Sequence, residues 1–217
     1  MEIIDFSKTN SLLNRFVAEI RDVAVQADRM RFRRNIARIG EVMAYEISKH
    51  LDYTTKAVTT PLGTAHVSTP DDEVVLCTIL RAGLAFHEGF LNYFDDAGNA
   101  FISAYRRYKD ETEFEIVTEY LAAPTIDGKT LIINDPMLAT GCSMEACWHA
   151  IRTKGEPRRV HIASVIASDQ AVRHVQEVFP DAVTTVWCAA IDPELNEHSY
   201  IVPGLGDAGD LAYGPKD

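Results

Sequence analysis

The 217-residue chain has few cysteines and no long apolar run. No apolar stretch approaches the roughly 18 residues of a membrane span, and the acidic, polar start MEIIDFSKTN lacks the basic and apolar parts of a secretory leader. Its four cysteines form no CxxC pair and show no zinc-site spacing, so we expect reduced thiols: Cys77, Cys142, Cys147 and Cys188. We therefore expect a cytoplasmic protein without membrane attachment.

Positive charge is also scarce, because 21 Lys and Arg residues face 32 Asp and Glu residues, for a net charge of −11 at pH 7. General affinity for nucleic acid needs a positive surface, so we do not expect nucleic-acid binding. One basic cluster stands within a helical pattern: Arg29, Arg31, Arg33, Arg34 and Arg38. We interpret it as a solvated or subunit-facing helix surface with ion-pair partners, and a nucleic-acid site is the weaker alternative.

The length and the 47% hydrophobic content suit one compact domain, residues 1–217. Between Ser11 and Lys49, apolar residues recur every three or four positions, which predicts two amphipathic helices. Threonine-rich residues 55–70, broken by proline and glycine, predict short strands joined by a turn. Farther along, apolar strands alternate with helical patterns. This alternation predicts an α/β fold with a mostly parallel sheet flanked by helices.

The stretch LIINDPMLATGCSMEA combines a strand, a small-residue bend and a helix expected to begin near Ser143. Such a bend exposes backbone N–H groups and the positive end of the helix dipole, which together bind phosphate, and the Thr140 hydroxyl can add a hydrogen bond. Asp135, at the strand end, suits sugar hydroxyls or Mg²⁺ rather than phosphate. The alternative is an ordinary helix start capped by Asp135. A P-loop is disfavoured because no lysine follows Gly141.

Arg81 stands in the otherwise apolar stretch ILRAGLAF, directly after a predicted strand. Burying a guanidinium without a partner is costly, so Arg81 meets either a carboxylate or an anionic ligand. Ala82 and Gly83 let the backbone approach that ligand closely, and the guanidinium fork suits a pyrophosphate. A structural ion pair and a ligand contact both stay open on this stretch alone.

The tail YIVPGLGDAGDLAYGPKD contains the spacing GxGxxG at Gly204, Gly206 and Gly209. A dinucleotide fingerprint also needs a following helix and an acidic residue about 20 positions later, but the chain has only eight residues after Gly209. The glycines instead allow close backbone approach to a planar ligand. Asp207 and Asp210 could bind a metal or a hydroxyl-rich ligand, and a tail merely folded back on the protein is the alternative.

The segments ILRAG, DPMLATGCS and YIVPGLGDAGD together resemble, in order and approximate spacing, the uracil phosphoribosyltransferases. FRRNIARIGEVMAYE and VTTPLG are similar to the amino-terminal half of that family, so the resemblance covers nearly the whole chain. It implies a type I phosphoribosyltransferase fold, with amino-terminal helices and a small hood formed by residues 57–70 and the carboxyl-terminal tail. It also implies transfer of the 5-phosphoribosyl group from 5-phosphoribosyl 1-diphosphate (PRPP) to uracil, giving UMP and diphosphate.

The resemblance also assigns roles to matching positions. It implies a PRPP site of Arg81, Arg106, Asp135, Pro136, Met137, Leu138, Ala139, Thr140, Gly141, Cys142, Ser143 and Asp207. The implied uracil pocket comprises Ile201, Gly206, Asp207 and Ala208. The catalytic residues would be Asp135, Arg106 and Asp207. Mg²⁺ is the implied cofactor, and Asp207 would face it through PRPP.

Family members are commonly dimers or larger, so we expect a homo-oligomer, and the resemblance raises GTP as a candidate activator. Two other functions stay open: the same transfer to a different base such as a purine, and a nucleotide-sensing regulator of RNA or transcription. The arginine cluster motivates the regulator and the negative net charge weakens it.

The chain departs from the family pattern at several positions. Cys142 replaces a usual glycine, and we do not expect it to be a nucleophile because this transfer needs no covalent intermediate. The segment YRRYKDET is longer than usual, which leaves Arg106, Arg107 and Lys109 as competing diphosphate contacts. Leu211 replaces a basic residue and Ser199 a glycine. The isolated histidines, His87, His149 and His161, are interpreted as surface or packing residues.

Overall fold

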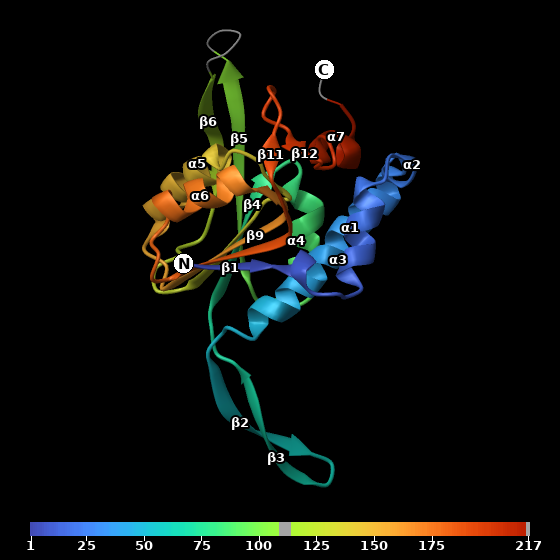
Figure 1. Cartoon of the computed structure of the whole chain (residues 1–217). Helices are drawn as coiled ribbons and strands as arrows, with labels where there is room; N and C mark the ends of the chain where they lie inside the picture. The colour runs from blue at the N-terminus through green and yellow to red at the C-terminus, as the bar shows by residue number, and fades with distance from the viewer. Residues whose placement is uncertain (109–113, 216–217) are drawn as a thin grey trace.

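A mostly parallel sheet forms the centre of the molecule (Figure 1). This computed structural model describes residues 1–108 and 114–215, with side chains for residues 1–103 and 120–215. The strands follow the order β1 (Glu2–Asp5), β10 (Thr184–Asp192), β9 (Arg159–Ser168), β7 (Thr130–Asn134), β4 (Val74–Leu80), β5 (Gly98–Tyr108) and β6 (Phe114–Ala122). Short β8 (Met137–Leu138) pairs with β9, and every pairing in this sheet is parallel except β5 with β6. The α/β prediction is therefore confirmed.

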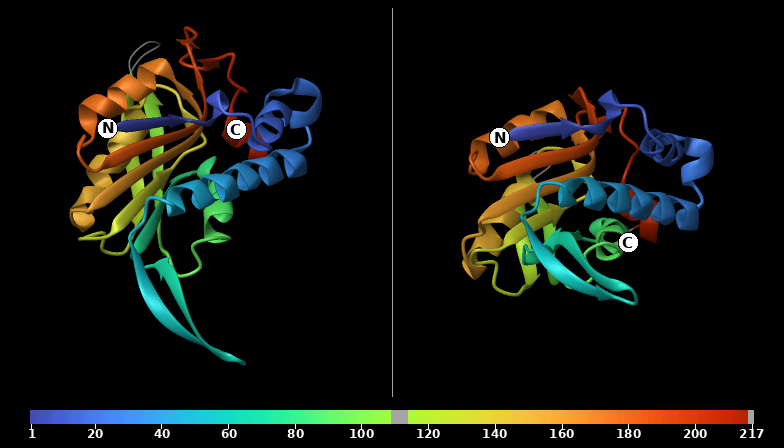
Figure 2. Two further views of the ribbon diagram at one scale, coloured as in Figure 1. Left: turned by 60° about the horizontal axis from the view of Figure 1, so that its bottom comes forward. Right: turned by 90° about the horizontal axis from the view of Figure 1, so that it is seen from below.

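Helices cover both faces of the sheet (Figure 2). One face carries α1 (Leu13–Arg21), α3 (Arg29–Ser48) and α4 (Gly83–Leu91), and the other carries α5 (Cys142–Ile151) and α6 (Asp169–Val178). Successive strand residues point to opposite faces. Leu76 accordingly packs in the apolar cluster of α3 and α4, whereas Cys77 packs in that of α5 and α6. Within the described residues, none of the helices has both the length and the apolar character to cross a membrane.

The amino-terminal region forms three helices instead of the two predicted between residues 11 and 49. The short α2 (Val23–Gln26) separates α1 from α3. Two aspartates make the breaks, because the Asp22 carboxylate accepts a hydrogen bond from Ala24 N and the Asp28 carboxylate accepts one from Arg31 N. Each side chain caps a new helix start, which the apolar spacing did not reveal. Phe6–Lys8 and Arg152–Lys154 form short 3₁₀ turns.

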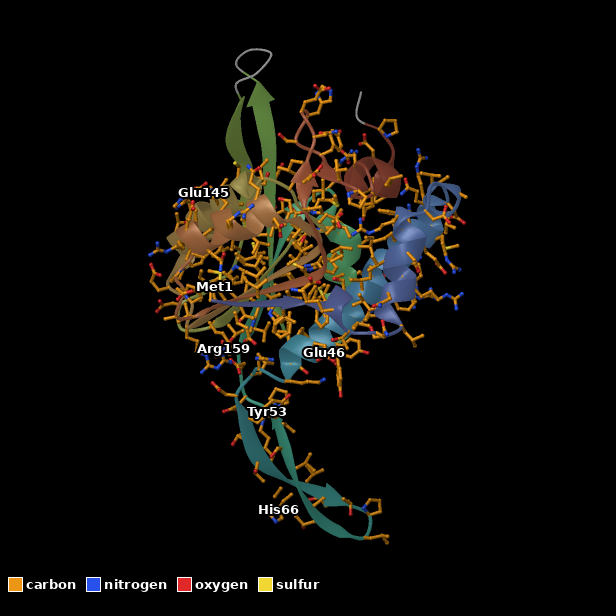
Figure 3. All side chains as sticks on the ribbon, viewed as in Figure 1. Met1, Glu46, Tyr53, His66, Glu145 and Arg159 are labelled. Carbon is orange, nitrogen blue, oxygen red and sulfur yellow. The ribbon has the colours of Figure 1, made fainter. Side chains whose placement is uncertain are left out.

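The predicted turn-linked strands form a hairpin of β2 (Tyr53–Thr60) and β3 (Gly63–Pro70), with most of its residues exposed. It projects from the edge where the parallel strands begin, and labelled Tyr53 and His66 lie along it (Figure 3). Asp72 anchors its base. The carboxylate accepts hydrogen bonds from the Thr130 hydroxyl at 2.5 Å and from Asp52 N at 2.5 Å, and it pairs with the Arg159 guanidinium at 3.5 Å.

The prediction that residues 57–70 and the carboxyl-terminal tail together form a small hood is wrong. The tail forms β11 (Glu194–Leu195), β12 (Ile201–Val202) and α7 (Ala208–Tyr213), which lie at the opposite end of the molecule from the hairpin (Figure 1). The hairpin leads directly into the start of β4, whereas the tail follows the end of β10. Because the strands are parallel, their starts and ends lie at opposite edges of the sheet.

Helices α3 and α4 cross with their backbones in contact. A Cβ atom at Gly89 would lie 2.1 Å from the carbonyl oxygen of Ala37, and one at Gly40 would lie 2.6 Å from that of Phe86. Both distances are shorter than any tolerable contact. The crossing therefore needs glycine on each helix.

We predict that Gly89→Ala destabilises the protein by about 3 kcal/mol, because the added methyl group forces the two helices apart. Gly63→Ala is the matched control, since a Cβ there meets nothing within 4 Å, and it should change stability by less than about 0.5 kcal/mol. Urea denaturation of both variants measures the difference. Equal stability of Gly89→Ala and the wild type would contradict the close crossing.

Candidate active site

Two of the predicted loops begin side by side at the carboxyl edge of the sheet. β4 and β7 are neighbours in parallel register, with Thr78 opposite Asn134. Arg81 follows the end of β4, and Asp135 follows directly after β7. Ligands of open α/β sheets bind at this edge. The tail reaches the same place, because the Arg81 guanidinium lies against Asp210.

Arg81 meets a carboxylate, which was one of the two alternatives from the sequence. Its Nη2 donates to Asp210 Oδ1 at 2.9 Å and to the Gly214 carbonyl at 3.3 Å. The ion pair is partly exposed, so it contributes little to stability. Arg81 Nε is buried and finds no hydrogen-bond partner among the described residues. The guanidinium thus keeps a free donor, and a more highly charged anion could displace its weak carboxylate partner.

Asp135 is nearly buried at the end of β7. Its Oδ1 accepts a hydrogen bond from Met137 N at 3.2 Å, and it does not cap α5, whose N-cap residue is Gly141. The cap alternative is therefore wrong. Burial raises the pKa of Asp135 to about 7, and the negative charge of Asp207 adds to the effect. Two carboxylates from distant segments thus approach each other, an arrangement that favours a cation or hydroxyl donors between them.

The segment from Pro136 to Ala139, which precedes the bend, is held against β9. Met137 and Leu138 form β8, and the Pro136 carbonyl accepts a hydrogen bond from Ile166 N at 2.9 Å. The Ser168 hydroxyl donates to the Ala139 carbonyl at 2.5 Å. These bonds fix the path of the backbone before the bend.

The bend itself turns at Gly141, whose φ of 87° is left-handed. A Cβ there would lie 2.6 Å from His174 Cδ2 on α6, so both the backbone and the packing require glycine. α5 begins at Cys142, one residue before the predicted start, and Cys142 N donates to the Thr140 hydroxyl at 3.4 Å. A hollow of about 50 Å³ lies at this helix start and is lined by Asp135, Met137, Leu138, Ala139, Thr140, Gly141, Ser143 and Met144.

The tail brings the predicted uracil-pocket residues to this edge. Ile201 and Ala208 are buried apolar residues, so the polar groups at these two positions belong to the backbone. Gly206 has a φ of 95°, and the Asp207 carboxylate caps α7 by accepting from Asp210 N at 2.9 Å. A hollow of about 400 Å³ lies between the tail and the amino-terminal helices, lined by Gln26, Ala27, Arg29, Leu205, Gly206, Asp207, Asp210 and Leu211.

A clamp that the sequence did not indicate holds the tail in place. Arg21 Nη1 donates to Asp192 Oδ2 at 2.7 Å and to the Gly204 carbonyl at 2.8 Å. Gly204 N donates to the same carboxylate at 2.8 Å. Arg33 on α3 adds a bond to the Ala212 carbonyl at 2.6 Å. The partners are far apart in the sequence, so no local motif marks them.

Other members of the arginine cluster also have partners on the protein. Arg31 pairs with Glu19 at 2.7 Å, and Arg34 lies 3.8 Å from Glu41. Arg38 Nη1 donates to Asn35 at 3.2 Å. These contacts support the interpretation of the cluster as a helix surface with ion-pair partners.

The structure describes only some of the remaining predicted positions. Arg106 and Arg107 belong to β5, opposite Ile116 and Glu115, but their side chains lie outside the described residues. Lys109 lies outside them entirely. Ser199, which replaces a family glycine, has a left-handed φ of 60°.

The residues fit Mg²⁺ only as a partly protein-held ion. The described part of the chain contains no group of three or more His, Cys, Asp or Glu residues able to enclose a metal. Asp135 and Asp207 nevertheless lie close enough for one charge to raise the pKa of the other. Mg²⁺ is often held by one or two carboxylates together with substrate phosphates. The donors present therefore suit Mg²⁺ shared with a phosphorylated ligand.

Comparisons with known structures agree with this architecture. The AQ2163 protein from Aquifex aeolicus has 30% identity and a TM-score of 0.86, with 98% of each chain covered. An orotate phosphoribosyltransferase from Mycobacterium tuberculosis, solved with PRPP, has 12% identity and a TM-score of 0.53, with 87% of this chain and 94% of that chain covered. At that identity the likeness concerns the fold alone.

Sequence comparisons are more specific. Uracil phosphoribosyltransferase from Porphyromonas gingivalis W83 is 64% identical over 216 residues, which cover 100% of both chains. The enzyme of the same name from Methanothermobacter thermautotrophicus is 41% identical over 189 residues, 86% of this chain and 85% of that protein. The family model described as uracil phosphoribosyltransferase matches residues 7–215. The chain therefore belongs to the uracil phosphoribosyltransferase family.

Proposed function

We propose that this chain, as one catalytic domain of residues 1–217, transfers the 5-phosphoribosyl group of PRPP to N1 of uracil. The products are UMP and diphosphate, which makes the reaction a pyrimidine salvage step. The observation that carries the proposal is the meeting of Arg81, Asp135 and the Gly141 bend at one sheet edge, next to the tail that carries Asp207.

The charges at this edge suit the proposed transition state, which is positive at the anomeric carbon and negative on the departing diphosphate. Arg81 and Arg106 would bind the diphosphate, with Arg81 exchanging its exposed Asp210 partner for the more highly charged ligand. Asp135 would bind the ribose hydroxyls and favour the positive charge on the sugar. Because both charges develop during the transfer, these groups would bind the transition state more tightly than the substrate.

The bend and the start of α5 would anchor the 5-phosphate. Backbone N–H groups of the bend from Ala139 to Ser143, the Thr140 hydroxyl and the positive end of the helix would supply the binding. The hollow at this position is lined by the small residues Ala139, Thr140, Gly141 and Ser143 of the bend, together with Asp135, Met137, Leu138 and Met144. Anchoring the 5-phosphate orients the anomeric carbon toward the base, which lowers the entropic part of the barrier.

Backbone groups of the tail would bind uracil. Ile201, Gly206 and Ala208 would offer main-chain donors and acceptors to the edge of the base, and the clamp between Arg21 and Asp192 keeps this backbone in place. Asp207 would face both uracil and PRPP. Mg²⁺, when bound with PRPP near Asp207 and Asp135, would neutralise charge on the diphosphate.

Three further features complete the proposal. We propose a homodimer or larger assembly in the cytoplasm, with GTP as a candidate activator. The resemblance to the family supports these features. Transfer to a purine and a role as a regulator of RNA remain the competing functions, and the tail segment PGLGDAGD favours uracil over a purine.

Product formation with several bases tests the proposal. Purified protein supplied with PRPP and Mg²⁺ should form UMP from uracil with a kcat/KM at least about 100-fold higher than for cytosine or hypoxanthine. A preference for hypoxanthine would support the purine alternative. Absence of product with every base, together with salt-dependent RNA binding, would support the regulator.

We predict that Asp207→Asn lowers kcat by about 100-fold, because the negative charge facing PRPP and Mg²⁺ is lost. Asparagine caps helices as well as aspartate does, so α7 should keep its start. Asp22→Asn is the matched control, since the Asp22 carboxylate caps α2 in the same way. The control should keep kcat within about twofold of the wild type. Steady-state kinetics of both variants measure the difference. Unchanged kinetics for Asp207→Asn would show that the tail is only structural.

Asp135 should make the stability of the ligand-free protein depend on pH. Its pKa is about 7 in the folded protein, against an ordinary value of 3.8. The folded state therefore binds the proton more tightly than the unfolded state, and Asp135 lowers stability increasingly as pH rises from about 4 to about 7. We predict that Asp135→Asn is more stable than the wild type at pH 8, by up to about 4 kcal/mol, and that this gain disappears near pH 4.

Urea denaturation at both pH values measures this gain. The same variant should lose most of its UMP synthesis, because the carboxylate that faces the ribose is gone. An equal stability difference at pH 4 and pH 8 would show that Asp135 ionises normally.

A further inference from the structure

Three buried polar side chains lie directly beneath the proposed site: Thr78 on β4, His87 on α4 and Asn134 on β7. All three are almost inaccessible to solvent, with exposures of 0%, 3% and 0%. Leu76 and Ile132 on the same two strands belong to the apolar cluster of this face, and the Asn99 side chain of β5 is a further polar neighbour of His87. Buried polar groups are costly unless they bond to one another, so this polar trio needs an explanation.

The Thr78 hydroxyl is the centre of the trio. It donates to Asn134 Oδ1 at 2.7 Å and lies 2.7 Å from His87 Nδ1. Burial lowers the pKa of His87, so the imidazole is neutral and carries one proton. Because the hydroxyl hydrogen points to Asn134, the Thr78 oxygen accepts from His87, which places the imidazole proton on Nδ1. One hydroxyl therefore joins two strands and a helix.

The elements joined by this hydroxyl carry the proposed site residues. Asn134 directly precedes Asp135, and Thr78 stands three positions before Arg81 on the same strand. The helix of His87 begins at Gly83, two positions after Arg81. A Cβ at Gly83 would lie 2.8 Å from Thr78 Cγ2, so the start of this helix packs directly on the threonine.

A third strand is in contact with the trio. The His87 ring packs on Phe101 with 5.1 Å between ring centroids, and Phe101 on β5 is the register partner of Thr78. β5 continues to Arg106, the second proposed diphosphate residue. The trio thus contacts the three strands that carry or lead to Arg81, Arg106 and Asp135, namely β4, β5 and β7.

We propose that the Thr78 hydroxyl, through its bonds to His87 and Asn134, is a positioning group that sets the separation of Arg81 from Asp135 for phosphoribosyl transfer. This inference rests on the function proposed above. The two side chains act on opposite ends of the bond that breaks, Arg81 at the diphosphate and Asp135 at the ribose. Without the hydroxyl, His87 and Asn134 would lose their shared partner and the two loops would shift relative to each other. Misplacement by about 1 Å can lower a rate by about 100-fold.

Thr78→Val tests the proposal, because valine keeps the shape of threonine and lacks the hydroxyl. We expect kcat to fall by about 10- to 100-fold, with the KM for uracil changed by less than about threefold, since the tail binds the base. Thr78→Ser restores the hydroxyl and should keep kcat within about threefold of the wild type.

Thr130→Val is the matched control for lost stability. Thr130 is equally buried, stands on β7 at the opposite edge of the sheet, and donates to Asp72 at 2.5 Å. This variant should lose stability but keep kcat within about twofold of the wild type. A kcat for Thr78→Val within twofold of the wild type, or an equal loss in Thr130→Val, would overturn the proposal. If the wild type itself makes no UMP, the proposed function fails before this comparison begins.

A measurement on the unmodified protein keeps the proposal testable if Thr78→Val does not fold. Nitrogen-15 NMR of labelled histidine reports which ring nitrogen carries the proton. We expect the Nδ1–H form for His87, assigned by its loss in His87→Phe. The Nε2–H form would mean that His87 does not donate to Thr78, and it would overturn the proposed network.

Discussion

Parallel pairing of β4, β7 and β9 is the constraint on which the proposed site depends, because it places the ends of these strands at one edge of the sheet. The register sets Thr78 opposite Asn134, so the loops that carry Arg81 and Asp135 begin side by side. The glycine crossing holds α4, which follows Arg81 in the chain, close against α3. A shift in register would separate the two charged residues even if both loops kept their local shapes.

The charged groups of the candidate site are only partly balanced by the described residues of the protein. The buried carboxylate of Asp135 has a raised pKa, and part of that rise comes from Asp207. Arg81 meanwhile uses a partly exposed Asp210 as its partner. A ligand with a diphosphate, a ribose and a metal ion would relieve both conditions, since it offers an anion to the arginine and a cation to the carboxylates. Destabilised groups of this kind are common at functional sites.

Much of the fold and of the candidate site could be predicted from the sequence. Apolar strands alternating with helical patterns indicated the α/β class, and strand-end positions marked Arg81 and Asp135. The hood and the number of amino-terminal helices were predicted wrongly, and the alternative of an Asp135 cap was also wrong. Composition predicted the hairpin as an element but contained no information on which edge of the sheet it joins. The N-cap of α5 is Gly141 because the left-handed bend directly precedes the helix.

The sequence by itself determined the element types, the Gly141 bend and the family motifs, because these depend on residues close together in the chain. Only the tertiary structure decided that Arg81 meets Asp210, that Arg21 clamps the tail through Asp192, and that Thr78 joins His87 to Asn134. Those contacts join residues far apart in sequence, or from different elements. Their distances are set by strand register and helix packing, which many residues determine together and no short motif encodes.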